Sequence, residues 1–196
     1  MLNRYFFQHN NIKSVVDLGC GDFLIGEEIY KDLKINYTGY DAYKELIDYH
    51  NKKYKPYNSK KENLYKITNN TGKKAGIIIL NPTLKDMTFN FIHSDFTSNP
   101  EQLNRADLCI IKDVLQHLPN CLIVQFMNYI TQSNKFKYIL IINCWITIND
   151  KNTTTERQDI EPGGFSSLSA LRYPLNKYGG RVIYGWYSKE VSLITL

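Results

Sequence analysis

The stretch that decides the fold reads IKSVVDLGCGD and occupies residues 12–22. A short β-branched apolar run within it stops at two alternating glycines, which predicts a buried parallel strand that enters a tight loop. Residues 23–33 then have helical periodicity, and INYTGYDA at 35–42 reads as a second strand that ends at Asp41. Strand, glycine-rich turn, helix and strand within roughly forty residues predict a βαβ unit.

Strands and helices continue to alternate through the rest of the chain. We expect a short helix in the first ten residues, further helices at 43–54 and 120–133, and strands at 90–96, 106–114 and 137–145. Residues 179–196 split into two β-rich runs, which predicts a closing hairpin. This alternation predicts an α/β fold, with a doubly wound, mostly parallel sheet, helices on both faces and a C-terminal antiparallel hairpin.

The length of 196 residues, with 43% hydrophobic and 22% charged residues, predicts a single domain that spans 1–196. Two segments interrupt its regular pattern. Residues 55–90 are polar and lysine-rich at first, and we expect an insertion there that carries an extra strand or hairpin. Residues 146–176 are rich in Thr, Ser, Gly and Pro, and we expect a substrate loop, since long loops in compact domains are usually functional.

Cysteine usage and charge limit the function classes. None of the four cysteines forms a CxxC pair, so we expect no metal site, no disulfide framework and a reducing, cytoplasmic location. No apolar run approaches the ~18 residues of a membrane span, and the first residues lack the apolar run of a signal peptide. The net charge of +5 is mild. A solvated lysine-rich insertion explains it as well as an anionic partner does.

The loop after the first strand carries the first candidate site. Gly19 and Gly21 allow a sharp turn and let a ligand lie against bare amides, while Asp17 can balance an ammonium group. A dinucleotide loop would require a third glycine where Leu24 stands, which disfavours NAD and a dehydrogenase. Asp41, about twenty residues further on, is placed to bind both hydroxyls of a ribose, although it can also cap the following helix.

Asp95 and Phe96 follow a third strand, and an acid beside an apolar ring suits an adenine; alternatively, Asp95 opens a turn. With VVDLGCGD, YTGYDA, FIHSDF and ADLCIIKDVLQHLP in this order, the chain resembles the class I S-adenosylmethionine-dependent methyltransferases from Ser14 to Pro119. The resemblance implies S-adenosylmethionine as the cofactor and a Rossmann-like, seven-stranded sheet. It also implies residue roles: the methionine part is held by Asp17, Gly19 and Gly21, the ribose by Asp41 and the adenine by Asp95 with Phe96.

The acceptor side is expected beyond the fourth strand, where Lys112, Asp113 and His117 face the crevice. We assign Lys112 to cofactor binding and His117 to general-base catalysis, because its titration range suits a base; alternatively, it is a polar helix residue bonded to backbone. Asp113 can orient His117, bind substrate hydroxyls or share a metal, or it can cap a helix. Asp159 in the long loop is a further catalytic candidate.

These residues favour an O-methyltransferase that modifies a small polar acceptor, such as a sugar or sugar nucleotide. An RNA methyltransferase is the first alternative, because lysines of the insertion can neutralise phosphates, but no motif for methylating exocyclic amines follows the fourth strand. A catalytically inactive binding or scaffold subunit is the second alternative. The intact glycine loop with its carboxylates argues against that role.

Overall fold

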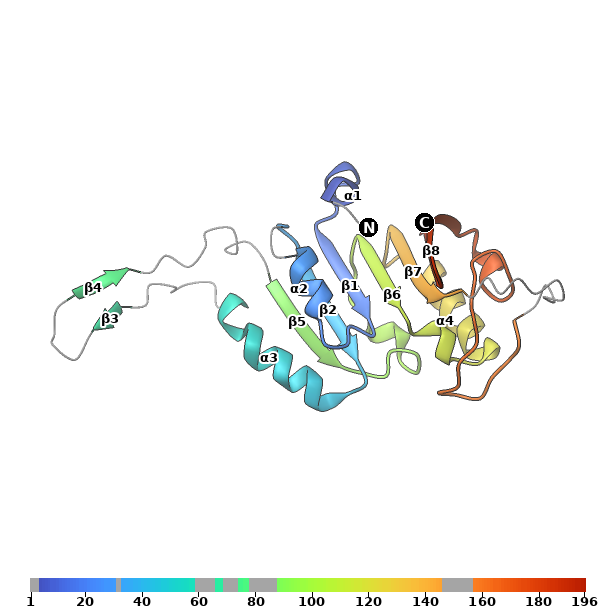
Figure 1. The fold of residues 1–196 in the computed structure, drawn as a ribbon, viewed down its shortest axis with the longest axis horizontal. Helices are drawn as coiled ribbons and strands as arrows, with labels where there is room; N and C mark the ends of the chain where they lie inside the picture. The colour runs from blue at the N-terminus through green and yellow to red at the C-terminus, as the bar shows by residue number, and fades with distance from the viewer. Residues whose placement is uncertain (1–3, 31–32, 59–65, 69–73, 78–87, 146–156) are drawn as a thin grey trace.

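The computed structural model describes residues 4–30, 33–58, 66–68, 74–77, 88–145 and 157–196. Its helices and strands follow the predicted alternation (Figure 1). In chain order they are α1 (Arg4–His9), β1 (Ser14–Leu18), α2 (Leu24–Tyr30), β2 (Asn36–Asp41), α3 (Lys44–Asn58), β3 (Lys66–Thr68), β4 (Lys74–Ile77), β5 (Thr88–His93), η2 (Pro100–Gln102), β6 (Leu108–Lys112), η3 (Leu115–His117), α4 (Asn120–Gln132), β7 (Tyr138–Cys144), η4 (Leu175–Tyr178), β8 (Arg181–Trp186) and β9 (Lys189–Thr195).

The main sheet has seven strands in the order β5-β2-β1-β6-β7-β9-β8. The first five are parallel to one another, whereas β9 runs antiparallel to both β7 and β8. The predicted fold class is therefore confirmed, including the antiparallel C-terminal hairpin. The strand order reverses between β1 and β6, and sheets of this kind bind ligands beyond the carboxyl ends of the strands at that point.

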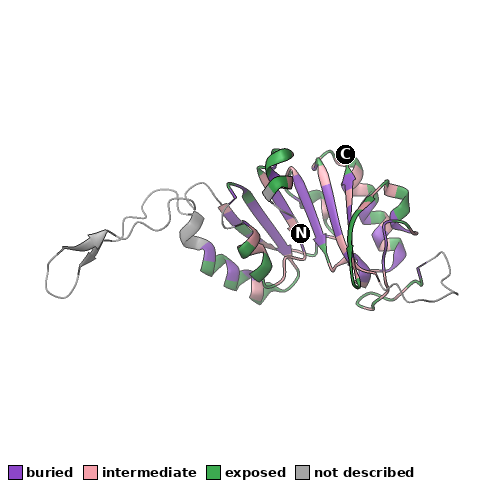
Figure 2. Cartoon of the chain, turned by 45° about the horizontal axis from the view of Figure 1, so that its top comes forward, coloured by how far each residue is buried: buried purple, intermediate pink, exposed green. Residues whose placement is uncertain are grey.

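Two hydrophobic clusters, one on each face, pack the helices onto the sheet. Figure 2 shows that the central strands between them are largely buried. On the α4 face, the buried positions Ile123, Phe126, Met127 and Ile130 recur at helical spacing, so one stripe of the helix packs on the sheet. On the opposite face, Phe23 packs among aromatic side chains from α2, α3, β2 and β5. Burial of both faces by apolar side chains is what stabilises this three-layer arrangement.

The segment predicted to be an insertion contains two paired strands. Strands β3 and β4 pair antiparallel in a separate two-stranded sheet, with Lys66 opposite Ile77 and Thr68 opposite Lys74. Helix α3 continues to Asn58, beyond its predicted end and into the predicted insertion. The predicted substrate loop is irregular in its described part, 157–174, and its first residues, 146–156, lie outside the described residues. No helix in the described part of the chain is long and apolar enough to cross a membrane.

Candidate functional site

The glycine loop sits at the switch in strand order and has one closed and one open face. Gly19 and Gly21 have φ values of +78° and +54°, in the left-handed region that favours glycine. A Cβ on Gly19 would lie 2.3 Å from Cγ2 of Val114, so the loops after β1 and β6 touch there. A Cβ on Gly21 would meet nothing within 4 Å. The backbone at Gly21 is therefore open to a ligand.

Asp17 is the next-to-last residue of β1, just before this loop, and its carboxyl group is partly buried. The hydroxyl of Tyr37 donates a hydrogen bond of 2.8 Å to its Oδ2. Burial raises the pKa of Asp17 to about 6, although the bond from Tyr37 and the charge of Lys112 lower it. The negative charge of Asp41 raises it further. Because burial disfavours the ionised form of Asp17, a cationic group of a ligand placed beside it would stabilise the carboxylate.

Asp41 joins the glycine loop to the start of α3. Its Oδ2 accepts the N–H of Gly21 at 3.0 Å, and its Oδ1 accepts the N–H of Tyr43 at 2.9 Å. The second bond closes a turn between β2 and α3, and because α3 begins only at Lys44, Asp41 is not its N-cap; the first bond belongs to the loop. Asp41 thus binds the backbone of the glycine loop directly.

His50 also binds the glycine loop, and the sequence analysis did not identify this residue. Its ring is buried, lies 4.6 Å from the ring of Phe91, and donates from Nε2 to the carbonyl of Gly21 at 2.8 Å. The peptide groups on both sides of Gly21 are therefore fixed, one by Asp41 and one by His50. No sequence signal marks this role, because His50 occupies an ordinary buried position of an amphipathic helix.

Asp95 and Phe96 follow β5 near the same edge. Asp95 accepts bonds from the N–H and hydroxyl of Thr97 and from the hydroxyl of Ser98, and these contacts lower its pKa. It thus opens a turn, as in the alternative interpretation, and it remains exposed. The ring of Phe96 is buried and packs 5.8 Å from Phe126 in the core.

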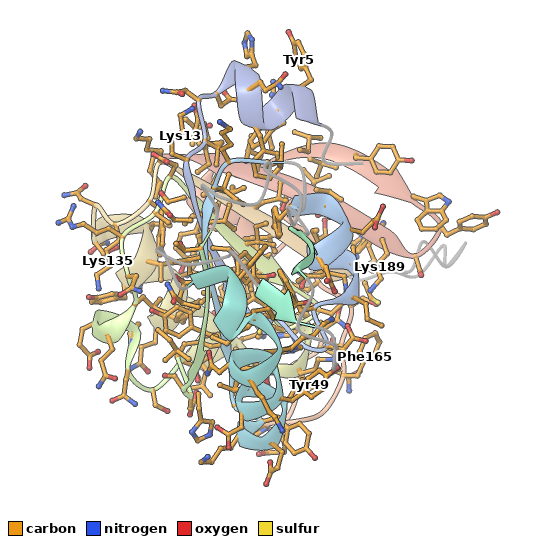
Figure 3. All side chains as sticks on the ribbon, turned by 90° about the vertical axis from the view of Figure 1, so that its left-hand side faces the viewer. Tyr5, Lys13, Tyr49, Lys135, Phe165 and Lys189 are labelled. Atoms are coloured by element: carbon orange, nitrogen blue, oxygen red, sulfur yellow. The ribbon has the colours of Figure 1, made fainter. Side chains whose placement is uncertain are left out.

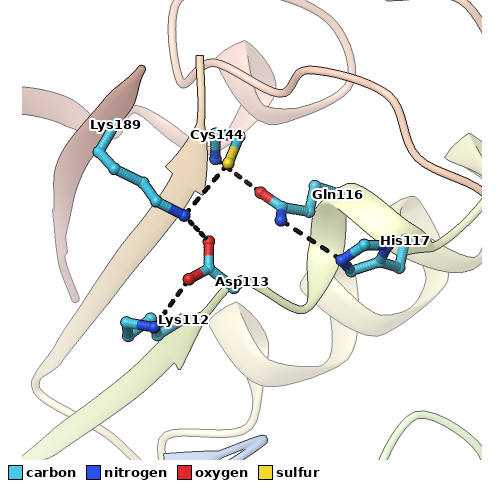
Figure 4. Close-up of polar contacts among 6 residues, drawn as sticks. All are labelled: Lys112, Asp113, Gln116, His117, Cys144 and Lys189. Atoms are coloured by element: carbon cyan, nitrogen blue, oxygen red, sulfur yellow. Dashed lines mark hydrogen bonds and ion pairs between the residues drawn. The ribbon is translucent and has the colours of Figure 1, made fainter. Parts of the chain in front are cut away.

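A charged cluster occupies the carboxyl end of β6 (Figure 4). Asp113, at φ +58°, accepts one bond from the ammonium of Lys112 at 2.7 Å and one from that of Lys189. Although burial raises the pKa of Asp113, both ammonium groups lower it below its ordinary value. Lys189 also lies 3.1 Å from Sγ of Cys144. Asp113 therefore orients lysines rather than His117.

His117 lies one turn further on and contacts the loop at 157–165. Its Nδ1 must carry the proton donated to the carbonyl of Gly164 at 2.8 Å, since a carbonyl only accepts. Its Nε2 then accepts a long bond of 3.3 Å from the buried amide of Gln116, whose Oε1 accepts the N–H of Cys144. This assignment of the tautomer leaves Nε2 as the basic nitrogen.

The loop at 157–165 is tied to the segment after β6. Oδ1 of Asp159 accepts the N–H of Asn120 at 2.7 Å, at the start of α4, and these backbone bonds lower the pKa of Asp159. The buried guanidinium of Arg157 donates to the carbonyls of Gln116 and Leu118 and to the side chain of Asn120. Asp159 thus caps a helix in this structure, and Arg157 is a second residue that sequence reasoning missed.

The tertiary structure therefore brings these predicted residues together in two groups at the carboxyl ends of the strands. One group lies at the glycine loop and consists of Asp17, Gly19, Gly21 and Asp41. The other group follows β6 and consists of Lys112, Asp113 and His117. Within the described ranges, no group of three or more His, Cys, Asp or Glu residues is placed to hold a metal ion.

Solved methyltransferases share this fold. The methyltransferase domain of bacterial CtHen1 is 15% identical, with a TM-score of 0.58 over 98% of this chain and 95% of that one. The S-adenosylmethionine-dependent methyltransferase SibL is 10% identical, with a TM-score of 0.58 over 96% of this chain and 51% of that one.

The N-terminal domain of EvdMO1, solved in the presence of SAH and D-fucose, is 10% identical, with a TM-score of 0.56 over 98% of this chain and 80% of that one. No protein-family model matches the sequence, and a search of curated proteins found no match either. The structural likeness establishes that the chain has the fold of the class I methyltransferases.

Proposed function

We propose that this chain, which has the class I methyltransferase fold, binds S-adenosylmethionine and transfers its methyl group to an acceptor. The observation that carries the proposal is the open backbone at Gly21, which Asp41 binds and which follows the partly buried carboxyl group of Asp17 by four residues, at the switch in strand order. An acid that takes a ribose and a partly buried acid that takes an ammonium group are the two polar anchors that such a cofactor needs.

The cofactor roles follow from the positions of these groups. Asp17 receives the methionine ammonium, whose charge offsets the unfavourable burial of the carboxylate. Asp41 receives the ribose hydroxyls through lone pairs that its two backbone bonds leave free. Lys112, whose side chain is 47% exposed, reaches the methionine carboxylate. Asp95, after β5, receives the adenine amino group, and Phe96 closes the apolar wall behind it.

For the acceptor we propose a hydroxyl group of a small polar molecule such as a sugar or sugar nucleotide. His117 is the general base: its Nδ1–H is donated to Gly164, and its Nε2 takes the acceptor proton once the long bond from the Gln116 amide is released. Asp113 contributes by fixing the two lysines beside the crevice, and Asp159 contributes by holding the substrate loop against α4. Methyl transfer from a sulfonium is an in-line displacement, so positioning these groups and excluding water is the main catalytic task.

The first experiment is calorimetric titration with S-adenosylmethionine, S-adenosylhomocysteine and NAD. The proposal requires binding of the two adenosyl ligands and none of NAD. Asp41→Ala should weaken that binding while the protein stays folded. Asp48→Ala is the matched control, because Asp48 is an exposed carboxylate on α3 that pairs with Lys44 one turn away. Unchanged affinity in Asp41→Ala would remove the ribose assignment.

Turnover is then measured as formation of S-adenosylhomocysteine with candidate sugars and sugar nucleotides. His117→Ala should keep cofactor affinity but lower turnover of a hydroxyl acceptor at least ~100-fold, as expected for loss of a general base. His9→Ala, in the exposed part of α1, is the control. Normal turnover in His117→Ala would exclude the base, and cofactor binding without turnover on any acceptor would favour the scaffold alternative.

A further inference from the structure

The tip of the C-terminal hairpin reaches the candidate acceptor site. Lys189 pairs with Cys144 of β7 on one side and with Trp186 of β8 on the other. Directly paired residues of antiparallel strands place their side chains on the same face of a sheet. The three side chains therefore share one face at the carboxyl end of β7, and the ammonium of Lys189 extends from there to Asp113 (Figure 4).

This cluster has an excess of positive charge. The ammonium groups of Lys112 and Lys189 both bind the single carboxylate of Asp113, one on each oxygen, which leaves one net positive charge in the protein without cofactor. Each ammonium has three N–H donors, and contacts with the described part of the chain use one on Lys112 and two on Lys189. The side chains are 47% and 32% exposed. The cluster is suited to binding an anion and has little capacity to accept bonds from a neutral hydroxyl.

Exposed aromatic rings lie at the tip of the same hairpin, where Trp186 pairs with Lys189 across the two strands. Trp186 is 60% exposed and Tyr187 is 86% exposed, and their ring centroids lie 5.4 Å apart. Large aromatic side chains are usually buried, and a ring that faces solvent offers a flat surface to a planar ligand. Figure 3 shows Lys189 and, on the loop that contacts His117, Phe165, which is 49% exposed. The acceptor side thus combines aromatic surface with positive charge.

We infer that the acceptor is linked to a nucleoside diphosphate, that is, a nucleotide-activated sugar rather than a free sugar. Lys189 binds its phosphate oxygens, while Trp186 stacks on the base. The inference rests on the proposed function and deepens it by selecting one class of acceptor. Phosphate and base supply the negative charge and the planar ring that complement this surface, whereas a free neutral sugar supplies neither.

The test is calorimetric titration of the protein saturated with S-adenosylhomocysteine, using UDP as the probe and uridine and glucose as probes without phosphate. UDP should bind at least ~10-fold more tightly than uridine, and glucose should show no binding at the same concentrations. Lys189→Gln should raise the Kd for UDP about 10-fold, and Trp186→Ala should raise it about 5- to 10-fold.

Matched controls separate this surface from general effects of charge and exposure. Lys44→Gln removes an exposed lysine on α3, and Tyr49→Ala removes an aromatic side chain on the same helix that is 58% exposed. Both should bind UDP normally, and all four variants should keep the Kd for S-adenosylhomocysteine within about 2-fold and unfold cooperatively.

Three results would overturn the inference. If the protein binds S-adenosylhomocysteine but not UDP at millimolar concentration, the acceptor class is wrong and the proposed function stands. If affinity for oligouridylate rises with each added nucleotide well beyond that for UDP, the surface serves single-stranded nucleic acid instead. If S-adenosylhomocysteine itself does not bind, the proposed function fails, and the inference fails with it.

Discussion

Replacement of Asp17 by Asn should make the folded protein more stable at neutral pH while it weakens cofactor binding. The pKa of Asp17 rises from 3.8 to about 6, chiefly through burial. A shift of about 2 units corresponds to about 3 kcal/mol of unfavourable free energy for the ionised form in the folded state. Asn is neutral, so the substitution removes the unfavourable free energy of the buried charge. Its Oδ1 can still accept the bond from the hydroxyl of Tyr37.

The pH dependence of the free energy of unfolding shows whether ionisation of Asp17 is the cause. Between pH 4 and 6 the folded state binds a proton at Asp17 that the unfolded state has released, so wild-type stability falls as pH rises through this window. The advantage of Asp17→Asn should therefore be absent near pH 4 and complete by pH 7. There the free energy of unfolding should be about 1–3 kcal/mol above wild type, or roughly 2–4 °C in Tm for each kcal/mol.

The assay is urea and thermal unfolding at pH 4, 5, 6 and 7, with titration of S-adenosylhomocysteine at pH 7. Affinity should fall at least ~10-fold, since a charge-assisted bond to the methionine ammonium is lost. Asp107→Asn is the control of opposite sign. Burial raises the pKa of Asp107, but the ion pair with Lys137 and bonds from Lys13 and Ser14 lower it overall, so this variant should lose stability at pH 7. A stability difference for Asp17→Asn that is zero, negative or independent of pH would refute the reasoning.

Three further substitutions test the supports of the site. His50→Phe keeps the ring packing but removes the donor to the Gly21 carbonyl, and should raise the Kd for S-adenosylhomocysteine about 5-fold by calorimetry, whereas His50→Gln should restore most of the affinity. Gly19→Ala should lower the free energy of unfolding by about 1–3 kcal/mol in urea, because its φ is +78° and its Cβ would contact the Val114 side chain; adding Val114→Ala should recover the steric part alone. Asp159→Ala should lower Tm through loss of the α4 cap, and a loss of turnover at unchanged Tm would instead support a direct catalytic role.

Much of the fold could be read from the sequence, because its signals are local. The β-branched run before Gly19, the glycines themselves and the helical spacing of 120–133 each depend on residues within a few positions of one another. The glycine loop and Asp41 belong to the same βαβ unit, so their proximity also followed from the pattern. The end of α3 was predicted four residues too early, since Pro56 and the lysines around it resemble a loop.

The acceptor side depends on contacts that no local pattern encodes. Lys189 reaches Asp113 across 76 positions of sequence because β9 inserts between β7 and β8, and His50 reaches Gly21 only because α3 packs back against the sheet. Asp159 was predicted to be catalytic because it lies in the long loop, but its carboxylate binds the N–H of Asn120 at the start of α4. The sequence by itself determined the alternation of elements and the end of the sheet at which the cofactor is expected, since periodicity and backbone freedom act between neighbouring residues. Only the tertiary structure decided which distant charges meet there, because that depends on strand order and packing.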